Sequence, residues 1–166
     1  MLRMMSASSV PIRSTHSWAL VFAGGLVAAT LDLLYACVFW RVKSDVPAER
    51  IFQSVAAGLL GEASFQGGTA TAGLGVALHY LIAVSMSVVY YVAARRWALL
   101  GQRPLLYGAG YGLLLYMIMN YIVVPLSAAG PASKDPLWIT LSIAAHVLLI
   151  GIPISLFVRR ALAYEG

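Results

Sequence analysis

Four polar residues stand inside long apolar stretches of the sequence, and their chemistry is the first indication of function. They are Asp32, His79, Asn120 and His146. A carboxyl group and imidazoles that are buried together can bind and release protons, and such groups mark proton and ion pathways inside membranes. The same groups can also form hydrogen bonds that hold helices together. We therefore expect either a pathway or a set of interhelical hydrogen bonds at these positions.

Metal or haem binding is a further alternative for the same side chains. A metal site needs three or four ligands, which Asp32, His79 and His146 would supply. Glu62 is the candidate for a fourth ligand. Two histidines on separate helices can also bind a haem axially. The sequence contains no Walker loop and no GxGxxG, HExxH or GxSxG motif, so we expect no enzymatic activity and predict no catalytic residue.

The composition of the chain predicts where these residues lie. Of its 166 residues 61% are hydrophobic and only 10% are charged, with a mean hydropathy of +0.84. A soluble domain has roughly 45–50% apolar and about 25% charged residues. The net charge of +5 comes from short Lys and Arg clusters between apolar blocks, which is typical of membrane flanks and not of a nucleic-acid surface. We expect the lipid bilayer as the main partner and no nucleic acid.

Four apolar stretches are long enough to cross a bilayer. About 20 apolar residues are needed for a spanning helix, and a helix satisfies its backbone hydrogen bonds inside lipid. The predicted spans are 18–40, 74–93, 105–126 and 137–158. The predicted fold class is therefore all-α, an integral membrane bundle of four transmembrane helices over residues 18–158, flanked by an N-terminal segment (1–17) and a tail (159–166). The bulky residues that end the first span favour a retained helix over a cleaved signal.

Basic residues predict the orientation of the bundle. Four spans place the N-terminal segment, the 94–104 loop and the tail on one side of the membrane, and these segments carry seven Arg residues. The opposite side carries four Lys and Arg residues. Because basic flanks stay in the cytoplasm, we expect both termini to be cytoplasmic.

The segment between the first two spans, residues 41–73, contains a short helix. Ser44 or Asp45 is placed to cap it, and Pro47 fits its first turn. Apolar residues then recur at helical spacing over residues 51–59. This stretch is too short to span the bilayer, so it predicts an interfacial or re-entrant helix.

Small residues follow this helix over residues 61–73. They form either a compact turn packed on the helix ends or a non-helical lip over a cavity, which membranes tolerate where protein or water covers it. In the second case Glu62 and Gln66 are the polar side chains of the lip.

The four polar residues fall at similar depths in their spans. At a rise of 1.5 Å per residue they lie about 7 to 14 Å below the outer ends. Small residues mark the packed faces of membrane helices, and Gly108 and Gly112 continue the face of Asn120. We therefore expect one polar cluster in the outer half of the bundle, facing its interior. Pro125 and Pro153 are expected to kink the last two spans.

Several short strings carry a resemblance to known proteins. They are Phe65-Gln66-Gly67-Gly68, Leu78-His79-Tyr80, Met119 to Ser127, and His146 together with Gly151-Ile152-Pro153-Ile154. In these strings the chain resembles a group of uncharacterised bacterial inner-membrane proteins and is distantly similar to the YagU-like family, over about residues 18–160. The resemblance implies a bacterial inner membrane. It implies no reaction, cofactor or site residue.

These features together predict an integral inner-membrane protein that acts as a small proton- or solute-translocating component. The alternative is a structural or assembly subunit of a larger membrane complex, in which the polar cluster is interhelical hydrogen-bond glue. A chain of this size has little room for a pathway of its own. Translocation would therefore involve a homo-oligomer or a larger membrane complex.

Overall fold

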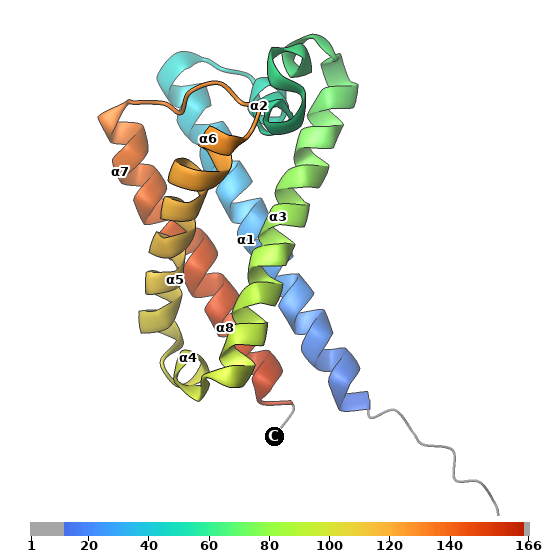
Figure 1. Cartoon of the computed structure of the whole chain (residues 1–166), viewed down its shortest axis with the longest axis vertical. Coiled ribbons are helices and arrows are strands. Elements are labelled where there is room, and N and C mark those ends of the chain that lie inside the picture. The colour runs from blue at the N-terminus through green and yellow to red at the C-terminus, as the bar shows by residue number, and fades with distance from the viewer. Residues whose placement is uncertain (1–11, 165–166) are drawn as a thin grey trace, which may run out of the picture.

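The computed structural model describes residues 12–164, and 89% of it is helix. No strand occurs between residues 12 and 164. Four helical segments are long and apolar enough to cross a membrane (Figure 1). The predicted all-α bundle with four spans is confirmed, and the protein is a multi-pass membrane protein. Residues 1–11 of the predicted N-terminal segment and the last two residues of the predicted tail lie outside the described residues.

Each span extends beyond the apolar stretch that predicted it. The first two are α1 (Ile12–Ser44) and α3 (Gly68–Arg96). The third consists of α5 (Pro104–Ile118), η2 (Met119–Val123) and α6 (Val124–Leu126). The fourth consists of α7 (Pro136–Ala145), η3 (His146–Gly151) and α8 (Ile152–Leu162), and the short α4 (Ala98–Gln102) precedes α5. The apolar stretch covers only the part of a helix that lies in the hydrocarbon core of the bilayer. The helix itself can continue beyond it, as α1 does past Trp40 through Arg41 and Lys43.

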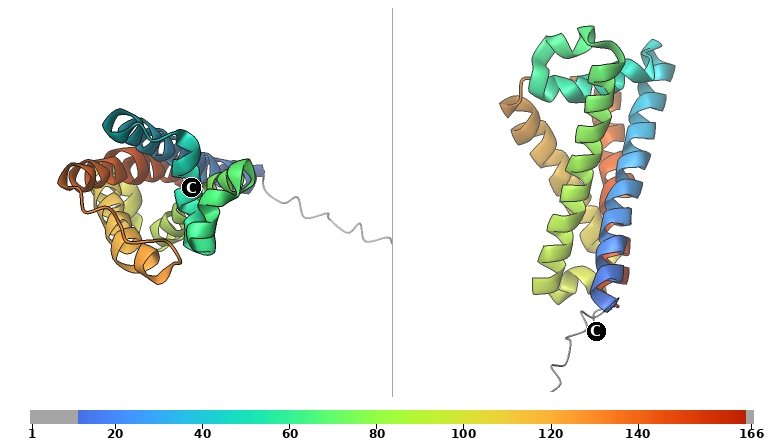
Figure 2. Two further views of the ribbon diagram at one scale, coloured as in Figure 1. Left: turned by 90° about the horizontal axis from the view of Figure 1, so that it is seen from above. Right: turned by 90° about the vertical axis from the view of Figure 1, so that its right-hand side faces the viewer.

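The short helix predicted between the first two spans is α2 (Ala48–Leu60), followed by the 3-10 helix η1 (Gly61–Gln66). α2 crosses one end of the bundle, nearly at right angles to the spans (Figures 1 and 2). Gly75 of α3 lets it approach closely, because a Cβ there would meet the Phe52 carbonyl group. We call this end of the bundle the α2 end and the opposite one the α4 end.

The predicted cap of this helix is wrong. α1 continues to Ser44, and Asp45 ends it with a positive φ of 54°. α2 then begins at Ala48, after Pro47, without a hydrogen bond from a capping side chain. Asp45 instead lies 3.0 Å from Arg41 in an exposed ion pair.

Glycines bring the helices together along the bundle. A Cβ at Gly25 of α1 would lie 2.7 Å from the Cα of Val84 on α3. Gly108 and Gly112 of α5 lie against the backbone of the fourth span, where Gly151 faces them in return. The predicted packing role of the Gly108/Gly112 pair is therefore confirmed.

The half of the bundle at the α4 end is tightly packed. Its core contains Val21, Tyr90, Tyr91, Ile154 and Val158. Four hydroxyl groups link neighbouring helices there by donating to backbone carbonyls: Ser17 to Ala161 (3.0 Å), Ser87 to Val21 (2.7 Å), Tyr111 to Met86 (2.8 Å) and Ser155 to Pro104 (2.8 Å). These bonds cross between α1, α3, α5 and α8, so this half holds its helices with hydroxyl groups.

Two π-helical turns, η2 and η3, interrupt the last two spans. Each lies directly before a proline, Pro125 or Pro153. A proline inside a helix lacks the N–H that would bond four residues back, and its ring clashes with that carbonyl. A widened turn relieves the clash, and such turns are frequent at functional sites. The predicted proline kinks thus take the form of π-turns.

Candidate functional site

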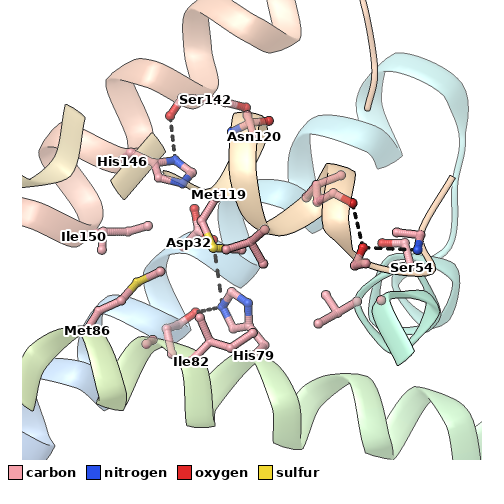
Figure 3. A pocket seen from close by; sticks show the side chains of 18 of the residues that line it. Asp32, Ser54, His79, Ile82, Met86, Met119, Asn120, Ser142, His146 and Ile150 are labelled. Carbon is pink, nitrogen blue, oxygen red and sulfur yellow. Dashed lines mark hydrogen bonds and ion pairs between the residues drawn. The ribbon is translucent and has the colours of Figure 1, made fainter. Parts of the chain in front are cut away.

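A cavity of about 320 Å³ lies between the helices in the half nearest the α2 end (Figure 3). All four polar residues predicted as a cluster line it: Asp32 from α1, His79 from α3, Asn120 from η2 and His146 from η3. Most of the remaining lining is apolar, including Ala28, Val55, Ile82, Met86, Val123 and Ile150. The structure therefore brings the four residues together around one space inside the membrane-spanning region.

Asp32 lies between the two histidines. In Figure 3 the imidazole rings of His79 and His146 lie on opposite sides of it. The Oδ2 atom of Asp32 is 3.9 Å from Nε2 of His79, and both side chains are about one-fifth exposed, at 19% and 18%. Within residues 12–164, no hydrogen bond to the Asp32 carboxyl group is formed. Its oxygens are thus available to a ligand or a proton.

Backbone contacts define the tautomer of each neutral histidine. Nε2 of His79 lies 3.0 Å from the carbonyl oxygen of Ala29, and Nδ1 of His146 lies 2.9 Å from that of Ser142. A carbonyl oxygen only accepts, so each of these nitrogens carries the proton. The opposite ring nitrogens, Nδ1 of His79 and Nε2 of His146, then keep their lone pairs.

Three more polar side chains of the cavity donate to backbone, whereas the Ser142 hydroxyl lies 3.4 Å from that of Tyr35. The Asn120 amide donates to the Tyr116 carbonyl at 3.0 Å, and the amide keeps its oxygen and one N–H. Ser54 donates to Ile51 at 2.6 Å. Ser127 donates to Val124 at 2.8 Å. Donors around the cavity are therefore largely satisfied by the protein itself.

A second cavity of about 190 Å³ adjoins the first. Asp32, His79 and His146 line both cavities, so they form the boundary between them. The second cavity leads to an aromatic cluster at the α2 end, where Tyr35 and Trp138 stack with ring centroids 5.6 Å apart. Ser54 is exposed and also lines both spaces, so they reach the protein surface beside α2.

Glu62 and Gln66 do not form a lip over the cluster, and this prediction is wrong. Both are exposed on η1, and neither lines either cavity. The roof is α2, through Val55 and Gly58, whose carbonyl accepts a hydrogen bond from Ala128 N–H at 3.0 Å. α2 thus lies between η1 and the cavity. The alternative of a compact turn fits η1 better.

The geometry does not support a metal site. Among residues 12–164, no three His, Cys, Asp or Glu side chains are arranged to hold a metal ion. The predicted set of Asp32, His79 and His146, with or without Glu62, is therefore not assembled. Axial haem binding by the two histidines stays a prediction.

An ion pair between the end of the first span and the residue that precedes the fourth ties the α2 end together. Lys43, at the end of α1, donates to Asp135, which also accepts from the backbone N–H of Trp138 at 2.9 Å. The hydrogen bond from Lys43 and the one from Trp138 lower the pKa of Asp135. Asp135 is the N-cap of α7, so this pair fixes the start of the fourth span to the end of the first.

Sequence reasoning missed several residues of the cavity. Trp138 and Ser54 are not among the residues predicted for the cluster, yet both line the two cavities. The π-turns that carry Asn120 and His146 were also not predicted, although Pro125 and Pro153 signalled them.

Comparisons with family models, with curated proteins and with solved structures found no match to this chain. The resemblance to the YagU-like family therefore stays a prediction.

Proposed function

We propose that the protein translocates a proton or a small solute through the cavity around Asp32. The observation that carries this proposal is a carboxyl group without a hydrogen bond from the described residues, set between two histidines in a cavity between the membrane-spanning helices. An ionisable side chain at the centre of a membrane helix costs about 2.5–3.5 kcal/mol on insertion scales. Packing alone gives no reason to keep such a group facing an open space.

The proposal places the protein in a bacterial inner membrane with both termini in the cytoplasm. The four-to-seven distribution of basic residues supports this orientation. The cavity would then open on the outer side, beside α2. The packed core at the α4 end would close it toward the cytoplasm.

This asymmetry makes the site accessible from one side only, so translocation requires a change in helix packing. The two π-turns suit such a change, because η2 and η3 carry Asn120 and His146 and lie where the third and fourth spans border the cavity. Their backbone is already displaced from regular helix geometry. A homo-oligomer or a larger membrane complex would supply the remaining surface of the pathway.

The second candidate is a structural or assembly subunit, and two contacts of cavity residues favour it, one of them between the Tyr35 hydroxyl of α1 and the Ser142 hydroxyl of α7 at 3.4 Å. His79 donates to the Ala29 carbonyl and so links α3 to α1. The other polar residues of the cavity give less support, because His146 and Asn120 donate to carbonyls of their own spans. Four interhelical hydrogen bonds that a structural role would require come from hydroxyl groups at the α4 end, away from the cavity.

Proton flux into liposomes tests the proposal. The purified protein is reconstituted into liposomes that contain a pH-sensitive dye, and a pH gradient is imposed across their membrane. K⁺ with valinomycin compensates the charge that the protons carry. We expect flux above that of empty liposomes, lost in Asp32→Asn and retained in Asp45→Asn. Asp45 is a matched control, because it lies outside the cavity at the same end, is exposed, and has a positive φ that Asn tolerates.

Two results would contradict translocation of protons. One is equal flux through the unaltered protein and Asp32→Asn. The other is the absence of flux in all variants together with a lower unfolding temperature of both Asp32→Asn and His79→Ala, which is the result that the structural subunit predicts.

A further inference from the structure

The hydrogen-bond directions around the cavity define the kind of ligand that it suits. The ring N–H groups of both histidines and the hydroxyl hydrogens of Ser54 and Ser127 are directed to backbone carbonyls. Most of the free positions are lone pairs, on the Asp32 carboxylate oxygens, one nitrogen of each imidazole and the Asn120 amide oxygen, while Asn120 keeps one N–H. A ligand that donates hydrogen bonds finds acceptors here.

The charge of the cavity favours the same kind of ligand. Among the described residues that line it, Asp32 is the only one with a formal charge, and none is Lys or Arg. A buried carboxylate gains most from a positively charged donor, because charge-assisted hydrogen bonds are about twice as strong as neutral ones. An anionic ligand would meet the like charge of Asp32 and mostly lone pairs, with no Lys or Arg to balance it.

The shape and the walls of the cavity define the rest of the ligand. Its volume of about 320 Å³ suits a small organic molecule, and its walls are mostly aliphatic with the Trp138 ring at one side. A hard inorganic cation needs six or more oxygen ligands or retained water. The walls supply few oxygens, so a cation with an apolar body fits better than a bare metal ion.

We infer that this cavity binds a small amphipathic organic cation, an ammonium whose N–H groups contact Asp32 and the free imidazole nitrogens while its apolar body contacts the aliphatic walls. The inference rests on the proposed function and names the solute class for the same site. Asp32 then holds either the ammonium or a proton. A protein of this kind can exchange one for the other across the membrane.

Equilibrium binding of three ligands of similar size but different charge tests this inference. The probes share a phenylethyl group, to which the carboxylate adds one carbon: 2-phenylethylammonium, neutral 2-phenylethanol and the anion 3-phenylpropanoate, titrated calorimetrically into the full-length protein in detergent at pH 8. Titration into empty micelles corrects for partition into detergent. We expect the ammonium to bind about tenfold or more tightly than either of the other two. Equal binding of the ammonium and the alcohol, or tighter binding of the carboxylate, would overturn the inference.

A pair of variants locates the site. Asp32→Asn keeps the shape of the side chain and removes its charge, so ammonium affinity should fall to that of the alcohol, whereas Asp45→Asn should bind like the unaltered protein. Unchanged ammonium affinity in Asp32→Asn would overturn the assignment to this cavity. If Asp32→Asn fails to fold, the order of the three ligands on the unaltered protein still decides the question.

Failure of this inference and failure of the proposed function give different results. Asp32-dependent proton flux without ammonium selectivity would leave translocation standing and refute the solute class. Asp32-dependent ammonium binding without flux would leave the binding site standing and refute translocation.

Discussion

Gly112 of α5 sits at the contact that positions His146, and its replacement by alanine has a result that the structure defines closely. A Cβ at this position would meet the His146 carbonyl oxygen and lie 2.7 Å from the Cα of Val147. Ordinary contacts begin at 3.4 Å, so the two backbones must separate by at least about 0.7 Å, and by more at the nearer His146 oxygen. Both obstacles are backbone atoms of η3 that no rotamer change can move.

The energy of this separation follows from overpacking. Extra methyl groups in a packed core cost about 1–3 kcal/mol. Gly110, two residues earlier on the same helix, is the matched control, because nothing lies within 4 Å of a Cβ there. Gly110→Ala removes a flexible residue from a helix, which stabilises the fold by up to about 1 kcal/mol. Gly112→Ala should therefore be the less stable variant by at least about 1 kcal/mol.

The assay is thermal and denaturant unfolding of both variants in the same detergent, followed by tryptophan fluorescence. Because η3 carries His146, Gly112→Ala should also weaken binding of 2-phenylethylammonium, whereas Gly110→Ala should not. Equal stability of the two variants would refute the close α5–η3 contact and, with it, the position of His146 beside Asp32.

Three further predictions concern other contacts. Ser87→Ala should destabilise the fold by about 0.6 kcal/mol, and at most about 1.7, because it removes the hydrogen bond from α3 to the Val21 carbonyl on α1. Ser85→Ala is the control, because the Ser85 hydroxyl bonds within its own helix, and it should lower the free energy of unfolding less. Equal effects of the two substitutions would count against the interhelical bond. Asp135→Ala should lower the unfolding temperature at neutral pH, since the lowered pKa of Asp135 means that its ionised form is the one that stabilises the fold. That difference should be present above the ordinary pKa of 3.8 and disappear as the pH falls through the lowered value, and a difference that persists in acid would contradict the ion pair with Lys43. Pro153→Ala returns a backbone N–H donor to the fourth span, so the π-helical turn η3 should tighten to regular helix and turn His146 away from the cavity. Proton flux should then fall. Flux equal to that of the unaltered protein would show that the π-turn does not position the site.

The sequence was sufficient to predict the fold because the bilayer constrains it strongly. Apolar length gave four spans, and each was found within a longer helix. The ends were less predictable, because a helix continues into the interface after its apolar residues stop, as α1 does through Lys43. The start of α2 was misplaced for a related reason: Ser44 belongs to the end of α1, and Asp45 ends that helix.

The site was predictable only in part. Small residues beside Asn120 placed it toward the bundle interior, and equal depths placed it near Asp32 and the two histidines. The roof could not be predicted, because the direction in which α2 crosses the bundle depends on the contact between Gly75 and Phe52, far from the polar residues. For the same reason the sequence could not decide between a compact turn and a lip that carries Glu62, which lines neither cavity.

Thiol labelling of neighbouring residues on α3 tests the central claim, that an aqueous cavity enters the membrane region from the α2 end. In a Cys37→Ala background, Ile82→Cys places a thiol in the cavity, and Leu81→Cys places one on the exposed outer face of the same helix turn. A membrane-impermeant, cationic methanethiosulfonate is added to proteoliposomes, and modification is followed by mass. We expect rapid modification of Ile82→Cys and none of Leu81→Cys, because a thiol in lipid does not ionise. Equal modification of both, or protection of Ile82→Cys from the reagent on both sides of the membrane, would contradict the account.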